Sequence, residues 1–201
     1  MTDNLNSFKN QSLKFNSARD FLPWLAVLSV IVLTAVQLFR QDRIWWCKFG
    51  DYAPWSSDAW GKHNSQHLFD PYSFTHVLHG VLYFWLTSLI FRKMPLAWRF
   101  FAAIFVECGW EILENTNSII EHYRAATLAL DYYGDSIANS LGDIFSCGVG
   151  FWLAYKLKFW RSLALFLLTE IVLLVWIHDS LLLNIIMLIH PIEAVKAWQN
   201  S

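Results

Sequence analysis

The sequence is short of charge. Lys, Arg, Asp and Glu make up 15% of its 201 residues, whereas about 25% is usual in a soluble domain. The 15 basic and 16 acidic residues nearly cancel, to a formal net charge of −1. That balance provides no basic surface of the kind that binds nucleic acid, so we expect no nucleic-acid partner.

Cysteine is scarce. The three residues, Cys47, Cys108 and Cys147, are odd in number and form no C-x-x-C pair, which argues against a disulfide framework. Cys108 and Cys147 fall in apolar runs, where cysteine ordinarily packs as a small apolar side chain. We therefore expect no disulfide scaffold.

Glycine is scarce as well, with eight residues, and the sequence has no internal repeat or low-complexity tract. Gly142, Gly148 and Gly150 all fall within one apolar run at 134–157. Small residues let membrane helices approach one another closely. We expect this run to pack tightly against a neighbouring helix.

Apolar residues are abundant. The chain is 56% hydrophobic and 17% aromatic, with 12 tryptophans. Several runs approach the ~20 residues that cross a bilayer as a helix, and tryptophan favours the membrane–water interface. The composition predicts an all-α, polytopic transmembrane helix bundle of about five spans, with an outer loop that forms a cap and an interfacial helix.

The expected elements form one helical domain at 21–190 between two tails. We expect spans at about 21–39, 74–91, 95–114, 134–157 and 162–181. A flexible cytoplasmic tail at 1–20, an outer loop at 41–73, a surface helix at 115–131 and a C-terminal tail at 191–201 complete the chain. The polar residues His178–Ser180 are expected to separate the last span from a helix lying at the interface.

Lys and Arg indicate an orientation. Nine of the 15 lie in segments 1–20, 92–99 and 156–161, which this arrangement places on one side of the membrane. Because cytoplasmic segments carry an excess of positive charge, we expect a cytoplasmic N-terminus. The long outer loop supplies four of the other six, so an inverted topology stays open.

Three glutamates share one face of the third expected span. Glu107, Glu111 and Glu114 repeat at i, i+4 and i+7. Ionisable residues inside apolar helices are costly and usually mark a functional site. We expect Glu111 and Glu107 to be catalytic, as acid/base groups or ligands, and Glu114 to bind substrate. The alternative is that the glutamates only hold the bundle together by pairing with neighbouring helices.

A second polar face opens the fourth expected span. Asp135, Asn139 and Asp143 repeat at i, i+4 and i+8. We expect Asp135 and Asp143 to be catalytic and Asn139, with Asn115, to bind substrate. The two aspartates are about 12 Å apart along a helix axis, so they cannot form a dyad with each other. Pairing of either with a glutamate of the third span stays open.

Four histidines lie near these carboxylates. His76 and His79, at i and i+3, open the second expected span. Imidazole and carboxylate together suit zinc and related ions, so these two histidines are candidate ligands of a divalent metal such as zinc. Their spacing departs from H-E-x-x-H, and a structural role is the default for either alone. His63 and His67, in the outer loop, are weaker candidates.

The expected topology brings all of these polar groups to one side of the membrane. Arg124, in the surface helix, lies there too and suits a phosphate or carboxylate headgroup of a substrate. A salt bridge to Glu114 or Asp131 is the equal alternative.

Three motifs carry a family resemblance: SQHLFDPYSFTHVLHG (65–80), ECGWEILEN (107–115) and YRAATLALDYYGDSIANSLGD (123–143). Over about residues 40–157 the chain resembles an uncharacterised family of bacterial multi-pass membrane proteins, known as a domain of unknown function. The Glu-rich span followed by D-x-x-x-N-x-x-x-D is distantly similar to VanZ-like membrane proteins, which are linked to glycopeptide resistance. The closer resemblance implies the bacterial inner membrane and supplies no established activity.

We expect a hydrolase or transferase that acts on a lipid-linked or cell-envelope substrate, with Glu111 as acid/base or ligand. One alternative is a non-catalytic, VanZ-like protein that binds an envelope lipid or peptide. Another is an ion-coupled transporter, which the lack of an inverted repeat disfavours. Membrane lipids are the expected partners, and the oligomeric state is left open.

Overall fold

A computed structural model describes residues 18–126 and 132–199. Seven helices are found there: α1 (Ala18–Arg40), α2 (Ser73–Ile90), α3 (Leu96–Glu114), α4 (Asn117–Ala126), α5 (Ile137–Ile177), α6 (Leu181–Ile189) and α7 (Glu193–Gln199). These residues contain no β-strand, only an isolated bridge between Trp55 and Phe69. The predicted all-α class is confirmed. The expected tail up to residue 17 and the surface-helix residues 127–131 lie outside the described residues.

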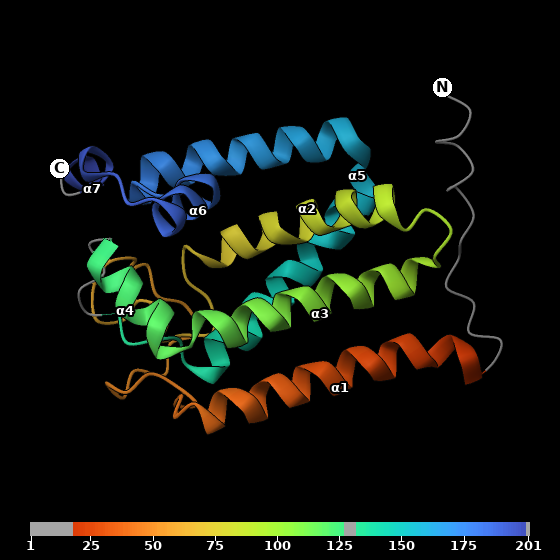
Figure 1. The fold of residues 1–201 in the computed structure, drawn as a ribbon, viewed down its shortest axis with the longest axis horizontal. Helices are drawn as coiled ribbons and strands as arrows, with labels where there is room; N and C mark the ends of the chain where they lie inside the picture. Colours follow the sequence, from red (N-terminus) through yellow and green to blue (C-terminus); the bar gives the residue numbers. More distant parts are fainter. Residues whose placement is uncertain (1–17, 127–131, 200–201) are drawn as a thin grey trace.

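The long helices run side by side, with all the short ones at one end (Figure 1). Helices α1, α2, α3 and the two arms of α5 alternate in direction. The arms of α5 meet at Lys158, whose φ of 64° and ψ of 179° are not helical. The loop 41–72 and helices α4, α6 and α7 lie at the same end (Figure 1), which we call the capped end.

Within the described residues, three helices are long and apolar enough to cross a membrane: Asp20–Arg40, Ser73–Ile90 and Ile137–Ile177. Helix α3 has 19 residues but carries Arg99, Glu107 and Glu111 among them. The expected number of about five spans is therefore not confirmed. Large apolar side chains remain exposed along α1 and the second arm of α5, among them Leu25, Leu28, Leu33, Leu168, Ile171 and Val175. Such faces suit lipid better than water.

Helices α2 and α5 pack together at two glycines. A Cβ on Gly80 would overlap the carbonyl oxygen of Cys147, and a Cβ on Gly150 would overlap that of Val77. The expected tight packing of the 134–157 run is thus found at Gly150. It is not needed at Gly148, where a Cβ would lie 3.5 Å from the Phe100 ring, an ordinary contact.

The loop 41–72 is tied to α5. The backbone N–H groups of Ser136, Ile137 and Ala138 donate to the carbonyls of Ser65 (2.9 Å), Ile44 (2.8 Å) and Trp45 (3.2 Å). The first N–H groups of a helix have no partner within it, so the loop supplies those partners. The indole N–H of Trp60 donates to the carbonyl of Ile177 at 2.9 Å. The loop therefore contacts both the beginning and the end of α5, which both lie at the capped end.

Helix α6 begins on a buried carboxylate. Oε1 and Oε2 of Glu170 accept from the backbone N–H groups of Leu181 (2.9 Å) and Leu182 (3.2 Å). A carboxylate at a helix N-terminus is favoured by the helix dipole. His178, with φ of 53°, ends α5, so His178–Ser180 separates two helices as predicted. The expected C-terminal tail contains α7.

The glycine contact gives a stability test. We expect Gly80→Ala to lower the free energy of unfolding by about 1–3 kcal/mol, because overpacking between rigid backbones forces them apart. Gly148→Ala is the matched control and should be neutral or slightly stabilising, since alanine is the better helix former. Thermal unfolding in detergent, followed by tryptophan fluorescence, measures both. Equal stability of the two variants would contradict the proposed role of Gly80.

Candidate functional site

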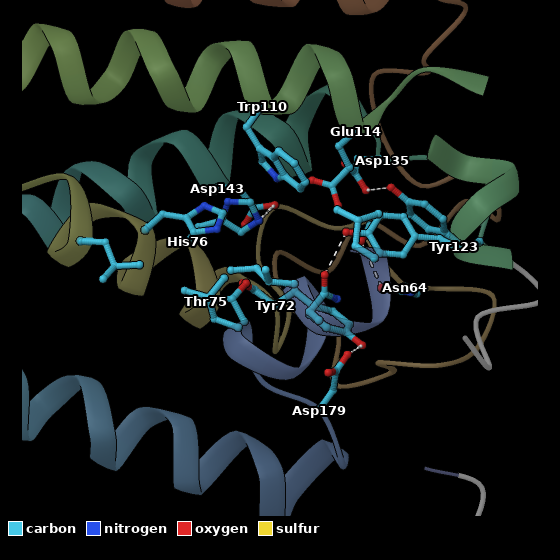
Figure 2. Close-up of a pocket in the computed structure, with 18 of the residues that line it drawn as sticks. Asn64, Tyr72, Thr75, His76, Trp110, Glu114, Tyr123, Asp135, Asp143 and Asp179 are labelled. Carbon is cyan, nitrogen blue, oxygen red and sulfur yellow. Dashed lines mark hydrogen bonds and ion pairs between the residues drawn. The ribbon is translucent and has the colours of Figure 1, made fainter. Parts of the chain in front are cut away.

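A cavity of about 290 Å³ lies at the capped end (Figure 2). Residues from the loop, from α2, α3, α4, α5 and α6, and from the segments just before α5 and α6 surround it. Its polar wall contains His76, His79, Glu114, Asp135, Asp143 and Asp179. Much of the rest of the wall is aromatic or aliphatic. The aromatic rings are those of Trp60, Tyr72, Tyr83, Trp110, Tyr123 and Tyr132, and the aliphatic side chains are those of Leu82, Leu181, Ile185 and Leu188.

Two histidines meet one buried carboxylate. Nδ1 of His76 lies 2.5 Å from Oε1 of Glu107, and Nδ1 of His79 lies 3.0 Å from Oε2. Glu107 has no exposed surface and lies behind the two rings. Because a carboxylate accepts hydrogen bonds, both Nδ1 atoms carry the proton. In the neutral rings Nε2 is then the acceptor, and Nε2 of His76 lies 3.9 Å from Oδ2 of Asp143.

The same residues include possible metal ligands. Donor atoms of His76, His79 and Glu107 lie within 4.8 Å of one another, and so do those of His76, Glu111 and Glu114. A tetrahedral zinc ion holds its nitrogen and oxygen ligands about 3.3 Å apart. The 2.5 Å between His76 and Glu107 is too short for two such ligands and has the length of a hydrogen bond. A metal at this position would require the carboxylate to shift.

Glu111 is buried without a hydrogen bond. It has no exposed surface, and neither carboxylate oxygen has a hydrogen-bond partner among the described residues. Nδ1 of His76 is near, at 3.4 Å from Oε1, but its proton points to Glu107. A buried polar group without a partner costs about 1–3 kcal/mol, and more for a charged group. Such a residue calls for a functional explanation.

Asp143 and Asp70 are connected through Ser73. The Ser73 hydroxyl donates to Oδ1 of Asp143 at 2.8 Å and accepts from the backbone N–H of Asp70 at 3.2 Å. Asp70 in turn accepts from the backbone N–H groups of Tyr72 (2.8 Å) and Ser65 (3.0 Å). The start of α2 is thus built around two aspartates.

Asp135 precedes α5 instead of lying in it. Ser136 is the N-cap, and its side chain accepts from the backbone N–H of Asn139. The expected face of Asp135, Asn139 and Asp143 is therefore wrong at Asp135, because the capping serine starts the helix two residues later. Asp135 is instead held by Asn115 (2.8 Å) and by the hydroxyl of Tyr132 (3.0 Å).

The profile of a family described as "Protein of unknown function (DUF2585)" matches residues 38–201. The chain belongs to this family.

The resemblance to an uncharacterised bacterial family is thereby confirmed. A UPF0314 protein of Brucella anthropi is 42% identical over 191 residues, which cover 95% of this chain and 97% of the relative. UPF0314 proteins of Paracoccus denitrificans and Rhizobium etli are 41% and 43% identical, and each alignment covers 89% of this chain and 93% or 91% of the relative. No solved structure matches. The match extends beyond residue 157, where the sequence motifs end.

The structure brings five of the ten predicted site residues to the cavity wall. His76, His79, Glu114, Asp135 and Asp143 line the cavity. Their catalytic, binding or metal roles stay predictions.

Five other predicted site residues do not line the cavity. Glu107 and Glu111 are buried behind His76, and the Asn115 side chain is occupied by Asp135 and the carbonyl of Glu111. Asn139 is buried, with neither side-chain amide atom hydrogen-bonded among the described residues. Arg124 is exposed, and its guanidinium carbon lies 5.0 Å from the centre of the Tyr133 ring.

Polar residues near the cavity that the sequence did not assign to the site include Asp70, Tyr72, Ser73 and Asp179. A signal existed for three of them, because Asp-Pro-Tyr-Ser at 70–73 has the form of a helix start, with an acid before a proline. That pattern gives no hint that Ser73 reaches Asp143. Asp179 lies in the expected break after the last span, and only folding brings it to the hydroxyl of Tyr72, 3.1 Å away.

Carboxylates around the cavity perturb one another. Burial raises the pKa of Asp70 from 3.8 to about 6, and the nearby charge of Asp135 adds to this. Burial likewise raises the pKa of Asp179 from 3.8 to about 6. No Lys or Arg side chain is among the residues that line the cavity. The carboxyl groups in the cavity wall therefore have no lysine or arginine side chain beside them as a counter-charge.

The raised pKa of Asp179 predicts a pH dependence. Because its pKa is higher in the folded than in the unfolded protein, the folded state binds the proton more tightly. The free energy of unfolding should therefore rise as the pH falls from 7 through 6 toward 4. Asp179→Asn should reduce this rise by up to about 2–3 kcal/mol, which corresponds to two pKa units.

Thermal unfolding at a series of pH values measures this effect. Asp42→Asn, which removes an exposed carboxylate, is the control. A pH dependence that Asp179→Asn and Asp42→Asn change equally would show that Asp179 does not titrate in this range.

Proposed function

We propose that this protein is a membrane-embedded hydrolase or group transferase that acts on a lipid-linked substrate of the cell envelope. The observation that carries the proposal is the pair of imidazoles, His76 and His79, which Glu107 orients at the wall of a cavity lined by both polar and apolar side chains.

The histidine pair has the arrangement of a general base. A hydrogen bond from Nδ1–H to a carboxylate sets the tautomer and leaves Nε2 to accept a proton. Nε2 would take the proton of an attacking water or hydroxyl group and return it to the leaving group. Glu107 would stabilise the imidazolium ion between these steps. Glu111 lies on the buried side of the same ring, with its Oε1 3.4 Å from Nδ1 of His76.

In an alternative form of this proposal, the site uses a divalent metal ion. His76, His79 and Glu107 would hold it after the carboxylate shifts, with Glu111 and Glu114 as further ligands. Such an ion supplies an activated water at neutral pH. The metal content of the purified protein therefore distinguishes the metal-free form of the proposed function from the metal-dependent form.

The cavity wall favours a neutral, hydroxyl-bearing head group. Carboxylates accept hydrogen bonds from hydroxyl groups and repel phosphate at short range. Aromatic rings such as Trp60, Trp110 and Tyr72 can stack on the apolar faces of sugar rings. The aliphatic side chains of Leu82, Ile185 and Leu188 suit the adjoining part of a lipid chain. A lipid-linked sugar fits these features better than the anionic group that Arg124 was expected to bind.

For the membrane arrangement we propose five spans in the bacterial inner membrane, with the N-terminus in the cytoplasm. Helix α3 has 19 residues, about 28 Å at 1.5 Å per residue, close to the ~30 Å of a hydrocarbon core. Helix α5, with 41 residues, is long enough for two crossings and reverses at Lys158. Arg92, Lys93 and Lys156 lie at the end opposite the cap, which the positive-inside rule assigns to the cytoplasm.

A binding function without catalysis is the second candidate, and the aromatic wall favours it. The distant similarity to VanZ-like proteins belongs to this candidate. It predicts that a bound envelope lipid is retained after His79→Gln and is lost after Trp110→Ala.

The test incubates purified protein with a lipid extract of the native membrane and follows lipid-linked sugars by mass spectrometry. We expect wild type to convert one class of lipid. His79→Gln and Glu107→Gln should slow the conversion by about 10²–10⁴-fold, because general acid/base catalysis contributes that much. Glu121→Gln, at an exposed position on α4, is the matched control and should retain wild-type activity.

Variants that fold normally but convert the lipid at the wild-type rate would overturn the assignment of the histidine pair. If wild type converts no lipid but co-purifies with one that Trp110→Ala loses, the protein is a binding protein.

A further inference from the structure

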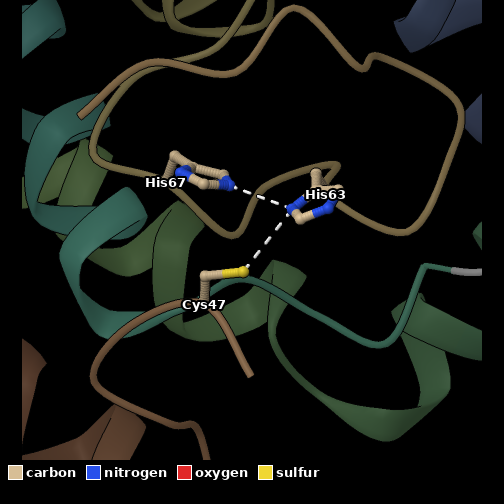
Figure 3. A group of neighbouring side chains, drawn as sticks. All are labelled: Cys47, His63 and His67. Atoms are coloured by element: carbon tan, nitrogen blue, oxygen red, sulfur yellow. Dashed lines mark hydrogen bonds between the residues drawn. The ribbon is translucent and has the colours of Figure 1, made fainter. Parts of the chain in front are cut away.

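A second group of side chains converges outside the cavity, within the cap (Figure 3). Cys47, His63 and His67 all lie in the loop 41–72, Cys47 in its first part and the two histidines in its second. The Cys47 sulfur lies 3.5 Å from Nδ1 of His63, which lies 3.1 Å from Nε2 of His67. All three donor atoms lie within 4.8 Å of one another. Cys47 and His67 are buried, with 7% and no exposed surface.

These distances match the edges of one coordination tetrahedron. A tetrahedral zinc ion holds two imidazole nitrogens about 3.3 Å apart, and a thiolate sulfur about 3.6 Å from a nitrogen. The observed 3.1 Å and 3.5 Å fall near both values. The spacing agrees as well, because His63 and His67 are separated by three residues, as in the H-x₃₋₅-H half of many zinc sites.

The hydrogen bonds of His67 orient it as a ligand. Its Nδ1–H donates to the carbonyl of Ala53 at 2.7 Å, which leaves the lone pair of Nε2 directed at the cluster. A bond of this kind from the second ring nitrogen is the usual support of a metal-bound histidine.

Hydrogen bonding alone accounts poorly for His63. Its Nδ1 faces both the Cys47 sulfur and Nε2 of His67, and one N–H cannot donate well to both. A cation that accepts all three lone pairs resolves the conflict.

Asp51 offers a fourth ligand. Its Oδ2 lies 3.9 Å from Nε2 of His67, and its Oδ1 accepts from the backbone N–H of Ala53 at 2.9 Å. Asp51 and Ala53 thus contact His67 from the same short segment of the loop. Thiolate, two imidazoles and a carboxylate are ligands that zinc accepts in protein sites.

We propose that Cys47, His63, His67 and Asp51 form a structural zinc site that holds the cap over the cavity. None of the four lines the cavity. The loop 41–72 has no helix or strand of its own and depends on contacts with α5. All four ligands lie in this loop, so the metal would join its first part, which follows α1, to its second part, which precedes α2, and would hold the loop in its folded form. This site is independent of the proposed function and of the histidine pair on α2.

The test replaces zinc with cobalt(II) in the full-length protein, after treatment with a chelator in detergent. We expect a near-ultraviolet charge-transfer band from thiolate to cobalt, together with the intense visible bands of tetrahedral coordination. Both should disappear when zinc is added. Cys47→Ser should abolish the charge-transfer band, whereas Cys108→Ser and Cys147→Ser, the matched controls, should retain it. His79→Ala should retain it too, which separates this site from a metal in the cavity.

A second measurement needs no variant. Alkylation of the chelator-treated wild type, mapped by mass spectrometry, should modify Cys47, and added zinc should prevent this because a metal-bound thiolate is protected. The absence of a charge-transfer band, its survival in Cys47→Ser, or alkylation of Cys47 that zinc does not change would overturn the proposal.

Discussion

The close approach of α2 and α5 is the constraint on which the rest of the structure depends. Gly80 and Gly150 let each helix reach the backbone of the other. Ser73, His76 and Gly80 are spaced by about one helical turn and lie on one face of α2. Because Gly80 brings that face onto α5, Ser73 and His76 meet Asp143. A larger residue at either glycine would push the two helices apart, and the polar groups that they carry would move apart with them.

The second determinant is the cost of charge in an apolar bundle. Glu107 and Glu111 have no exposed surface, and an unpaired buried charge is strongly destabilising. Glu107 is compensated by two imidazoles, but Glu111 has no hydrogen bond among the described residues. Groups that are retained at such cost usually serve function. The same reasoning explains why the cap is rich in hydrogen bonds to Asp70, Asp135 and Asp179.

Two histidine clusters with similar compositions differ in geometry. In the cavity, His76 and Glu107 are at hydrogen-bond distance, and Nε2 of His76 lies near Asp143. In the cap, His63 and His67 meet a sulfur at distances that fit a metal tetrahedron. The first arrangement suits proton transfer and the second suits a structural ion. The proposed chemistry and the proposed metal support of the loop 41–72 thus lie in separate places.

The sequence by itself determined the helical class, the approximate helix positions and the family, because apolar runs and their polar faces are properties of consecutive residues. It also indicated that Glu107, Glu111, Glu114 and Asp143 lie on helical faces at one end of the bundle. It misplaced Asp135, since helix capping by Ser136 depends on one local hydrogen bond.

Only the tertiary structure decided which groups meet. His76 contacts Glu107 across 31 residues, and Cys47 contacts His63 across 16. No periodicity records such pairs, because they follow from the angle and depth at which helices and loops pack. For the same reason Arg124, which the sequence places on the correct side, lies on the surface and away from the cavity.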